Sequence, residues 1–233
     1  AIYKQIIAQI ASSLSKNLDD LNDFFGKTLY GFQMKNNPSM SMFAQDSLNW
    51  ELESALEFLL QNGIIRATPE GLKTTDFGNL IAKSNYAVET AVKIKEYVST
   101  MEKLNPAEMI YALAETPDLP LISFKGRKSK DPVRDKLSEC GLFAVDIGNP
   151  EATAVSLIEW IDERNEYEIE NAYNVYSAST RRSAYEASRL VKFAKNTLEV
   201  LGNYSNLKDM DYLSARLYYG VKEDIIPLVV GVK

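Results

Sequence analysis

The longest uninterrupted helical pattern in the chain runs from Ser179 to Leu201, and it contains neither glycine nor proline. Ser179 or Thr180 can cap its first turn, because a side-chain hydroxyl accepts a hydrogen bond from a free backbone N–H group. At about 100° per residue, one face of this helix carries small and apolar side chains. These are Ala184, Ala187, Leu190, Val191, Ala194, Leu198 and Leu201. A long helix with one apolar face must bury that face, so we expect the other elements to be arranged around it.

The opposite face of this helix carries five residues that we call the basic row: Arg182, Tyr185, Arg189, Lys192 and Asn196. They fall within a sector of roughly 80°. Cations, a ring and an amide at this spacing suit a single strand of nucleic acid, because phosphates take the charge while bases stack on rings or guanidinium planes. The alternative is a solvated helix face that happens to be basic, and this stretch alone favours that alternative.

The charge of the chain restricts what it can bind. A net charge of −6 and an isoelectric point near 5.0 argue against a general affinity for nucleic acid or anionic membranes, so any such site must be local. Two segments are locally basic, residues 122–136 and 179–201, whereas residues 159–170 are strongly acidic. For residues 122–136, a mobile surface loop and a contact with DNA stay equally open.

Missing residue types exclude several kinds of chemistry. Cys140 is the single cysteine, so no disulfide can form within the chain, and we expect a cytoplasmic protein. The chain has no histidine, which removes histidine-based acid–base chemistry and nearly every zinc site. No apolar run reaches the roughly 18 residues of a membrane span, so no membrane partner is expected. The chain begins within a helical pattern and ends at Lys233 without a tail, which suggests a fragment of a longer protein.

Residues 1–87 are predicted to form a winged-helix domain, a variant of the helix-turn-helix. Hydrophobic periodicity and turn residues predict helices at 2–14, 19–29 and 47–62, strands at 64–67 and 72–75 around a turn at 68–71, and a helix at 76–84. The segment 31–42 is expected to be a loop. Leu14 is placed on the apolar stripe of the first helix. The 47–62 helix is expected to bury Leu48, Leu52, Ala55, Leu56, Leu59 and Leu60.

Residues 88–233 are predicted to form an all-helical bundle, because strand patterns almost vanish after this boundary. The expected helices lie at 88–101, from 106 to a break at 116–120, and at 131–139, 150–163, 165–172, 179–201, 208–218 and 222–229. Asn105-Pro106 and Asn149-Pro150 read as matching helix starts, since proline is tolerated at the first helical position. The fold class predicted is therefore mainly α, with one small β-hairpin and no sheet in the second half.

Gly26-Lys27-Thr28 is similar to the end of a phosphate-binding loop, but its context does not fit. That loop requires a glycine at position 21, where this chain has Leu21, and a buried strand where this chain has an acidic helix. No acidic metal-binding box follows a strand. Acidic pairs and runs, such as Asp19-Asp20 and residues 166–170, are expected to be solvated faces. We therefore predict no catalytic residue, no metal ligand and no cofactor site in this chain.

The 47–62 helix is the one that would read duplex DNA in a winged helix. Its charged residues are all acidic: Glu51, Glu53 and Glu57. Phosphates would repel this helix, and the hairpin offers only Arg66 and Lys73. We expect this domain to act as a scaffold against a neighbour, with Trp50 and Trp160 in a core or an interface.

Five stretches, taken in order, carry a resemblance over almost the whole chain. They are LNDFFGKTLYG at 21–31, ALEFL to NGII at 55–65 with LKTTDFG at 72–78, TPDLP at 116–120, WIDE at 160–163 with Arg181-Arg182, and RLYYGVKEDIIPLV at 216–229. Together they resemble the C-terminal region of the archaeal Hjm-type DNA helicases, which belong to the superkiller-like branch of superfamily II. The stretch at 216–229 is the most specific of the five.

The resemblance implies a parent protein with two RecA-like motor lobes before this chain and a helix-hairpin-helix domain after it. ATP and magnesium would bind in those lobes, and this chain would supply the winged helix and the helical "ratchet" domain. In the family, a long ratchet helix offers an arginine and, two turns later, a tryptophan to the bases of the unwound strand. Arg182 falls on the arginine position, and Arg189 falls on the tryptophan position. A guanidinium offers less stacking surface than an indole, so base stacking at Arg189 is expected to be weaker.

We interpret the chain as the winged-helix and ratchet part of an ATP-dependent 3′–5′ DNA helicase that works in DNA repair and contacts the translocating single-stranded DNA. One alternative is a non-enzymatic winged-helix DNA-binding regulator, which would need a basic helix at 47–62. Another is a protein-interaction module, which would show no measurable affinity for single-stranded DNA.

Overall fold

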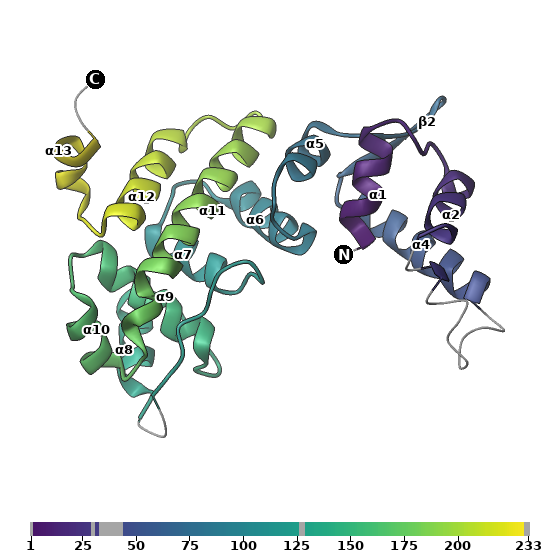
Figure 1. The fold of residues 1–233 in the computed structure, drawn as a ribbon. Coiled ribbons are helices and arrows are strands. Elements are labelled where there is room, and N and C mark those ends of the chain that lie inside the picture. Colours follow the sequence, from purple (N-terminus) through teal and green to yellow (C-terminus); the bar gives the residue numbers. More distant parts are fainter. Residues whose placement is uncertain (1, 29–30, 33–43, 126–128, 231–233) are drawn as a thin grey trace. The chain divides into compact units, whose positions relative to one another are not determined.

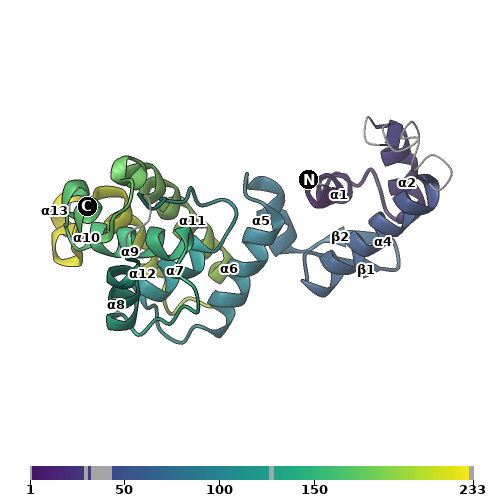
Figure 2. The same cartoon turned by 90° about the horizontal axis from the view of Figure 1, so that it is seen from below.

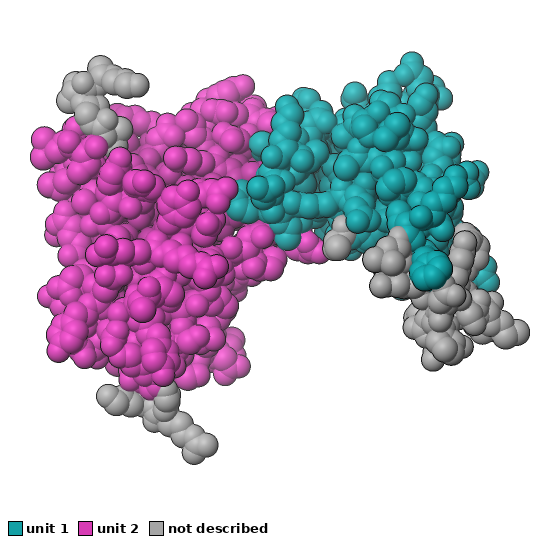
Figure 3. All heavy atoms as spheres, viewed as in Figure 1, with its two compact units in different colours: residues 1–88 teal, residues 89–233 magenta. Residues whose placement is uncertain are grey.

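The computed structural model describes residues 2–28, 31–32, 44–125 and 129–230. It divides into two compact units, residues 1–88 and 89–233, coloured separately in Figure 3. Helices dominate both units, and the described residues contain one two-stranded antiparallel sheet (Figure 1). The predicted fold class, mainly α with a small β-hairpin, is therefore confirmed. The predicted loop at 31–42 lies almost entirely outside the described residues.

The first unit has the element order of a winged helix. Its elements are α1 (Ile2–Ala11), α2 (Leu18–Gly26), α4 (Ala44–Gln61), β1 (Ile65–Thr68), β2 (Gly71–Thr74) and α5 (Asp76–Lys83). Two of the helix starts are fixed by side-chain caps: Asn17 accepts a hydrogen bond from the N–H of Asp20 at 2.9 Å, and Thr75 accepts one from the N–H of Gly78 at 3.0 Å. Figure 2 shows the hairpin beside α4, and β1 contacts this helix.

The hairpin begins one residue later than predicted. Ile65 pairs with Thr74 and Thr68 with Gly71, so Pro69 and Glu70 form the tip. Ile64 lies outside the ladder because its N–H donates to the carbonyl of Leu59 at 2.9 Å, which closes the end of α4. Its N–H group thus ends a helix, while its carbonyl accepts a hydrogen bond from the N–H of Thr75 at 3.0 Å, just beyond the ladder.

Two apolar residues of the first unit, Leu14 and Leu60, lie elsewhere than predicted. Leu14 is 71% exposed, because α1 ends at Ala11 and Ser13 adopts a left-handed conformation with φ of 58°. Leu60 is exposed at the edge of the stripe on α4, whereas the four other leucines of that stripe and Ala55 are buried. Trp50 is 71% exposed on α4, so it is not part of the core of this unit.

The second unit is an array of helices. Its elements are α6 (Val88–Thr100), α7 (Pro106–Ala114), α8 (Asp131–Glu139), α9 (Asn149–Ile161), α10 (Glu166–Tyr173), η1 (Ser177–Ser179), α11 (Thr180–Val200), α12 (Leu207–Tyr219), η2 (Glu223–Ile225) and α13 (Ile226–Val230). In the described part of this unit, extended pairing is limited to an isolated bridge between Phe124 and Val175. The expectation of a second half without a sheet is confirmed for these residues.

The two Asn-Pro helix starts differ in the structure. Asn105 caps α7, since its side chain accepts a hydrogen bond from the N–H of Ala107 at 3.0 Å. Asn149, in contrast, is already the first residue of α9, and the carboxylate of Glu151 accepts the hydrogen bond from the N–H of Gly148 at 2.8 Å. A matching dipeptide therefore marks both starts, but the capping group differs.

Helix α9 lies at the centre of the second unit. Residues 152–159 are all buried, and the helix contacts α7, α8, α10, α11 and α12 (Figure 1). A helix that is buried on all sides needs a partner for every polar side chain it carries. Thr153 meets this need by accepting a hydrogen bond from the N–H of Ile122 at 2.7 Å and donating one to Asn149.

Glu159 brings a carboxylate into this buried environment. It accepts hydrogen bonds from Lys136 at 2.9 Å, Arg164 at 2.6 Å and the hydroxyl of Tyr173 at 2.9 Å. Burial alone would raise the pKa of Glu159, but these three donors outweigh it and hold the pKa below its ordinary value. The carboxylate thereby joins α8, α9 and α10, although the sequence places it at the edge of a strongly acidic segment.

Trp160, the residue after Glu159, packs the C-terminal end of α9 against the end of α12. Its indole N–H donates to the carbonyl of Leu217 at 2.9 Å, and the guanidinium of Arg181 lies 6.0 Å from its ring centroid. Gly220 ends α12 with φ of 66°, and a Cβ atom at this position would lie 2.5 Å from the indole. Both the backbone conformation and the close contact therefore require glycine.

Gly220→Ala should lower the free energy of unfolding by about 2–5 kcal/mol, because it adds left-handed strain and overpacks Trp160. Gly202→Ala is the matched control: Gly202 has φ of 74° but nothing lies within 4 Å of its would-be Cβ. It should cost only about 1–2 kcal/mol. Urea unfolding followed by tryptophan fluorescence measures both, and equal costs would contradict the indole contact.

Glu159→Gln should lower the free energy of unfolding at pH 7 by about 1–3 kcal/mol, because Lys136 and Arg164 lose the buried negative charge and one of its two acceptor oxygens becomes an NH2 donor. A carboxylate with a folded pKa below its ordinary value of 4.5 stabilises the fold above that pH, and this contribution is lost as pH falls through the folded pKa. The variant should therefore lose less stability than wild type on acidification below 4.5. Glu199→Gln, an exposed change on α11, should follow the wild-type curve, and parallel curves for all three proteins would refute this prediction.

Candidate nucleic-acid interface

Helix α11 is held in the second unit by its apolar face. Ala184, Ala187, Leu190, Val191, Ala194 and Leu198 are all buried, as predicted. Leu201 is exposed, because the helix ends at Val200 and Gly202 turns the chain away. Helix α12 packs along α11, and the alanines allow the two backbones to approach closely.

Hydroxyl groups on the buried face fix the rotation of α11. Ser183 donates to the carbonyl of Pro120 at 2.7 Å, and Ser214 on α12 donates to the carbonyl of Ser188 at 2.9 Å. The first bond joins α11 to the loop before α8, and the second bond joins α11 to α12. Rotation of α11 about its own axis would break these bonds, so the opposite face keeps a fixed direction.

All five residues of the basic row lie on that opposite face. Arg182, Tyr185, Arg189, Lys192 and Asn196 are each exposed. The structure thus brings the predicted site residues together on one exposed side of a long helix. Whether nucleic acid binds there stays a prediction.

The cations of the row differ in their surroundings. Arg189 lies 3.2 Å from the carboxylate of Glu186 and 5.9 Å from the ring centroid of Tyr185. Its charge is therefore partly balanced within the helix. Arg182 and Lys192 form no ion pair with any residue that the structure describes. These two side chains carry the uncompensated charge of the row.

Two further aromatic residues adjoin the row, and the sequence interpretation did not assign them to the site. Tyr218 and Tyr219 end α12 and are 53% and 46% exposed. The ring centroid of Tyr218 lies 5.9 Å from that of Tyr185 and 4.8 Å from that of Tyr219. The signal in the sequence was the adjacent tyrosine pair itself, within the stretch 216–229, but its proximity to Tyr185 depends on how α11 and α12 pack.

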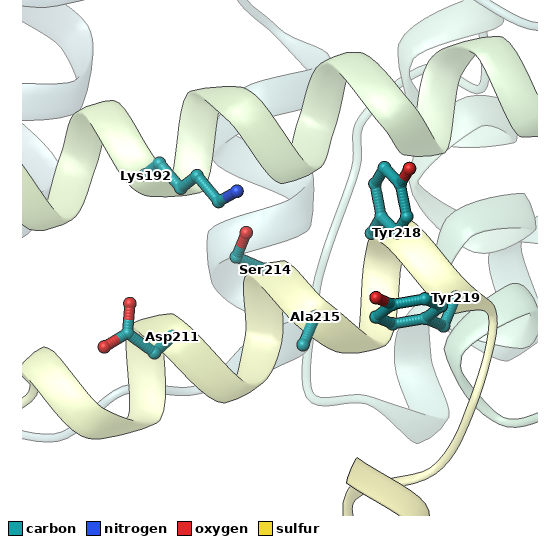
Figure 4. A pocket seen from close by; sticks show the side chains of 6 residues that line it. All are labelled: Lys192, Asp211, Ser214, Ala215, Tyr218 and Tyr219. Atoms are coloured by element: carbon teal, nitrogen blue, oxygen red, sulfur yellow. The ribbon is translucent and has the colours of Figure 1, made fainter. Parts of the chain in front are cut away.

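A hollow of about 590 Å³ lies where α11 and α12 meet. Figure 4 shows the side chains that line it: Lys192, Asp211, Ser214, Ala215, Tyr218 and Tyr219. In this view Lys192 extends from α11 toward α12, while the two tyrosine rings lie at the end of α12. One member of the basic row therefore also lines this hollow.

The locally basic segment 122–136 is largely neutralised within its unit. Lys125 pairs with Glu170, Lys136 with Glu159 and Arg134 with Asp131, and Lys130 donates to the carbonyl of Ile147. Residues 126–128 lie outside the described part, so nothing follows for Arg127 and Lys128. Among the described residues, the cations of this segment serve mainly to hold the helical unit together.

The remaining candidates for chemistry gain no support from the geometry. Lys27 follows the last residue of α2, and Thr28 donates to the carbonyl of Phe25, so this segment ends a helix where a phosphate loop would begin one. Across the described ranges, no group of three or more Asp, Glu, Cys or His residues could hold a metal ion. Likewise, none of the described helices is long and apolar enough to span a membrane.

Comparison with known proteins relates this arrangement to a class of DNA motor proteins. No family model matches the chain. Several known proteins are nevertheless similar to it in sequence. An ATP-dependent DNA helicase Hel308 from Pyrobaculum calidifontis is 25% identical over 234 residues, and the match covers 98% of this chain and 32% of the relative. The Hel308 proteins of Pyrococcus horikoshii and Thermococcus kodakarensis are 27% and 26% identical, covering 97% and 98% of this chain.

The similarity extends along nearly the whole chain, and it confirms the resemblance to archaeal DNA helicases. The chain spans about a third of the length of the first relatives it matches.

Proposed function

We propose that this chain is the winged-helix and ratchet part of an ATP-dependent DNA helicase, and that the basic row holds the translocating single strand. One observation carries the proposal: all five residues of the row are exposed on one side of a helix whose other side is fixed by packing and hydrogen bonds. A rigid helix is a better support for a binding site than a loop, because its side chains keep their mutual positions. The similarity to proteins named as ATP-dependent DNA helicases supports the same assignment.

In this proposal, the residues of the row share two tasks. Arg182, Arg189 and Lys192 hold phosphates, and the guanidinium planes of the two arginines and the ring of Tyr185 also offer surfaces on which bases stack. Such contacts carry no base code, so binding should be nearly independent of sequence. ATP and magnesium bind to the RecA-like motor lobes of the parent, and α11 retains the strand between their power strokes. Net travel in the 3′–5′ direction results because the strand cannot slip back.

The winged helix acts in this proposal as a scaffold and not as a reader of duplex DNA. The sequence of α4 contains no lysine or arginine, and it exposes Glu53 and Glu57. Phosphates would be repelled from this surface. The exposed indole of Trp50 fits a contact with another domain of the parent, such as a motor lobe or the helix-hairpin-helix domain.

The row should bind single-stranded DNA weakly and in a salt-sensitive manner. Arg182→Ala and Arg189→Ala should each weaken binding by about 1–3 kcal/mol, since each removes a charge and a stacking plane. Each should change the free energy of unfolding by less than about 0.5 kcal/mol, because both side chains are exposed. Fluorescence anisotropy with a labelled single strand at two salt concentrations measures the first effect, and urea unfolding measures the second.

Arg181→Ala is the matched control for this experiment. Arg181 is the neighbouring arginine on the same helix, but it lies off the row, stacks near Trp160 and lies 3.3 Å from Glu166. Its loss should reduce binding less than the loss of Arg182. If all three variants bind like wild type while remaining folded, α11 is only a solvated face and the proposal fails.

The chain alone should neither bind nor hydrolyse ATP, because Gly26-Lys27-Thr28 ends a helix and lacks the strand of a phosphate loop. Phosphate release from a pure sample should stay at the level of buffer, with and without single-stranded DNA. The control is Lys27→Ala, which should change nothing. ATP hydrolysis that this substitution abolishes would overturn the assignment of the motor to other parts of the parent.

A further inference from the structure

We propose that the hollow between α11 and α12 is a second base-binding site, in which an unstacked nucleobase of the same single strand contacts Tyr218 and Tyr219. This inference rests on the proposed function, because it assumes that a single strand runs along α11. The hollow adds residues of α12 to a site that the sequence assigns to the single helix α11. The residues that distinguish it, Tyr218 and Tyr219, lie outside the basic row.

The rings at the end of α12 are suited to stacking. Both are about half exposed, and their planes make an angle of 79°. Rings in this edge-to-face arrangement support each other and still leave ring surface accessible to a ligand. Tyr185 extends the cluster onto α11, at 52° to Tyr218. Three tyrosines thus form a continuous aromatic surface from the row to the hollow.

The charges around the hollow favour one phosphate and do not repel it. Lys192 lines the hollow and has no ion-pair partner among the described residues. Asp211 also lines it, but its carboxylate lies 2.8 Å from the ammonium of Lys195, which compensates its charge. The hydroxyl of Ser214 is already used as a donor to the carbonyl of Ser188. The uncompensated group is therefore a cation that lines the same hollow as the two aromatic rings, and a nucleotide requires both kinds of group.

The size and position of the hollow agree with this occupant. A volume of about 590 Å³ lies within the range of about 300–1,000 Å³ that is usual for small-ligand pockets. Sites of this kind often lie between the helices of a bundle. Lys192 belongs to both the row and the hollow, so a strand on the row would reach the hollow without leaving the surface of α11.

The test compares two labelled strands of equal length, one of ordinary single-stranded DNA and one with abasic positions throughout. The variants are the whole chain with Tyr218→Ala and Tyr219→Ala combined, and the same positions changed to Phe, which keeps the rings. Tyr167→Ala is the control, because Tyr167 is an exposed tyrosine on the acidic helix α10. Circular dichroism checks that each variant remains folded.

The alanine pair should bind the ordinary strand about 5- to 150-fold more weakly, which is the effect of losing one stacked base. The phenylalanine pair and Tyr167→Ala should bind like wild type, and the abasic strand should bind all four proteins equally. Since the abasic strand retains every phosphate, this pattern isolates a contact with bases.

Three results would overturn the inference. If the alanine pair binds the ordinary strand like wild type, the tyrosines take no base, and the proposed function stands as long as Arg182→Ala still weakens binding. If wild type binds both strands equally, the rings of Tyr218 and Tyr219 contact no base, and they form a surface that packs against another part of the parent protein. Absence of any binding by wild type at low salt would refute this inference and the proposed function together.

Discussion

The burial of residues 152–159 on every side of α9 is the constraint on which the second unit depends. Because these two turns have no exposed side, they must be surrounded, and α7, α8, α10, α11 and α12 contact the helix. Burial also forces every polar group of α9 into a specific contact, and the carboxylate of Glu159 shows how strict this requirement is. It collects donors from α8 and α10 and from the turn between α9 and α10, so one buried charge determines how three helices meet. The direction of the basic row follows from the same packing, since α11 can present only the side that α9 and α12 leave uncovered.

Electrostatic balance explains how an acidic chain can still offer a site for an anion. The cations that the structure describes in the segment 122–136 bind internal acceptors, and Lys195 pairs with Asp211 on the neighbouring helix. Arg182 and Lys192 differ because no carboxylate of the described residues pairs with them. The local field near α11 is therefore set by a few free charges and not by the net charge of −6. Such a field is short-ranged at physiological salt, so the binding proposed above would require a strand that already lies along the helix.

The helices and the hairpin could be predicted because periodicity reports the direction of each side chain relative to its own element. The same logic failed at element ends, where Leu14 and Leu201 continue a stripe after the helix has stopped. It also could not relate one element to another. The basic row lies on a single helix and could be listed in advance, whereas the proximity of Tyr218 to Tyr185 depends on the register between α11 and α12. The role of Glu159 as a buried acceptor could not be predicted for the same reason, since its position beside acidic residues in the sequence does not indicate which donors reach it from other elements.

A motor that moves along a strand needs contacts that treat every base alike and release each one quickly. Aromatic and guanidinium planes meet the first need, because every base has a face on which to stack. The second need limits how strong any one contact should be. An enclosed pocket that read base edges would hold some nucleotides longer than others and would make the step length depend on sequence. The exposed row on α11 and the open hollow at its side have the opposite character, since they combine shallow stacking surfaces with free cations and offer few fixed hydrogen-bonding groups. Retention of the strand would then come from the sum of several weak contacts on two adjoining helices, and movement would require only that they break one at a time.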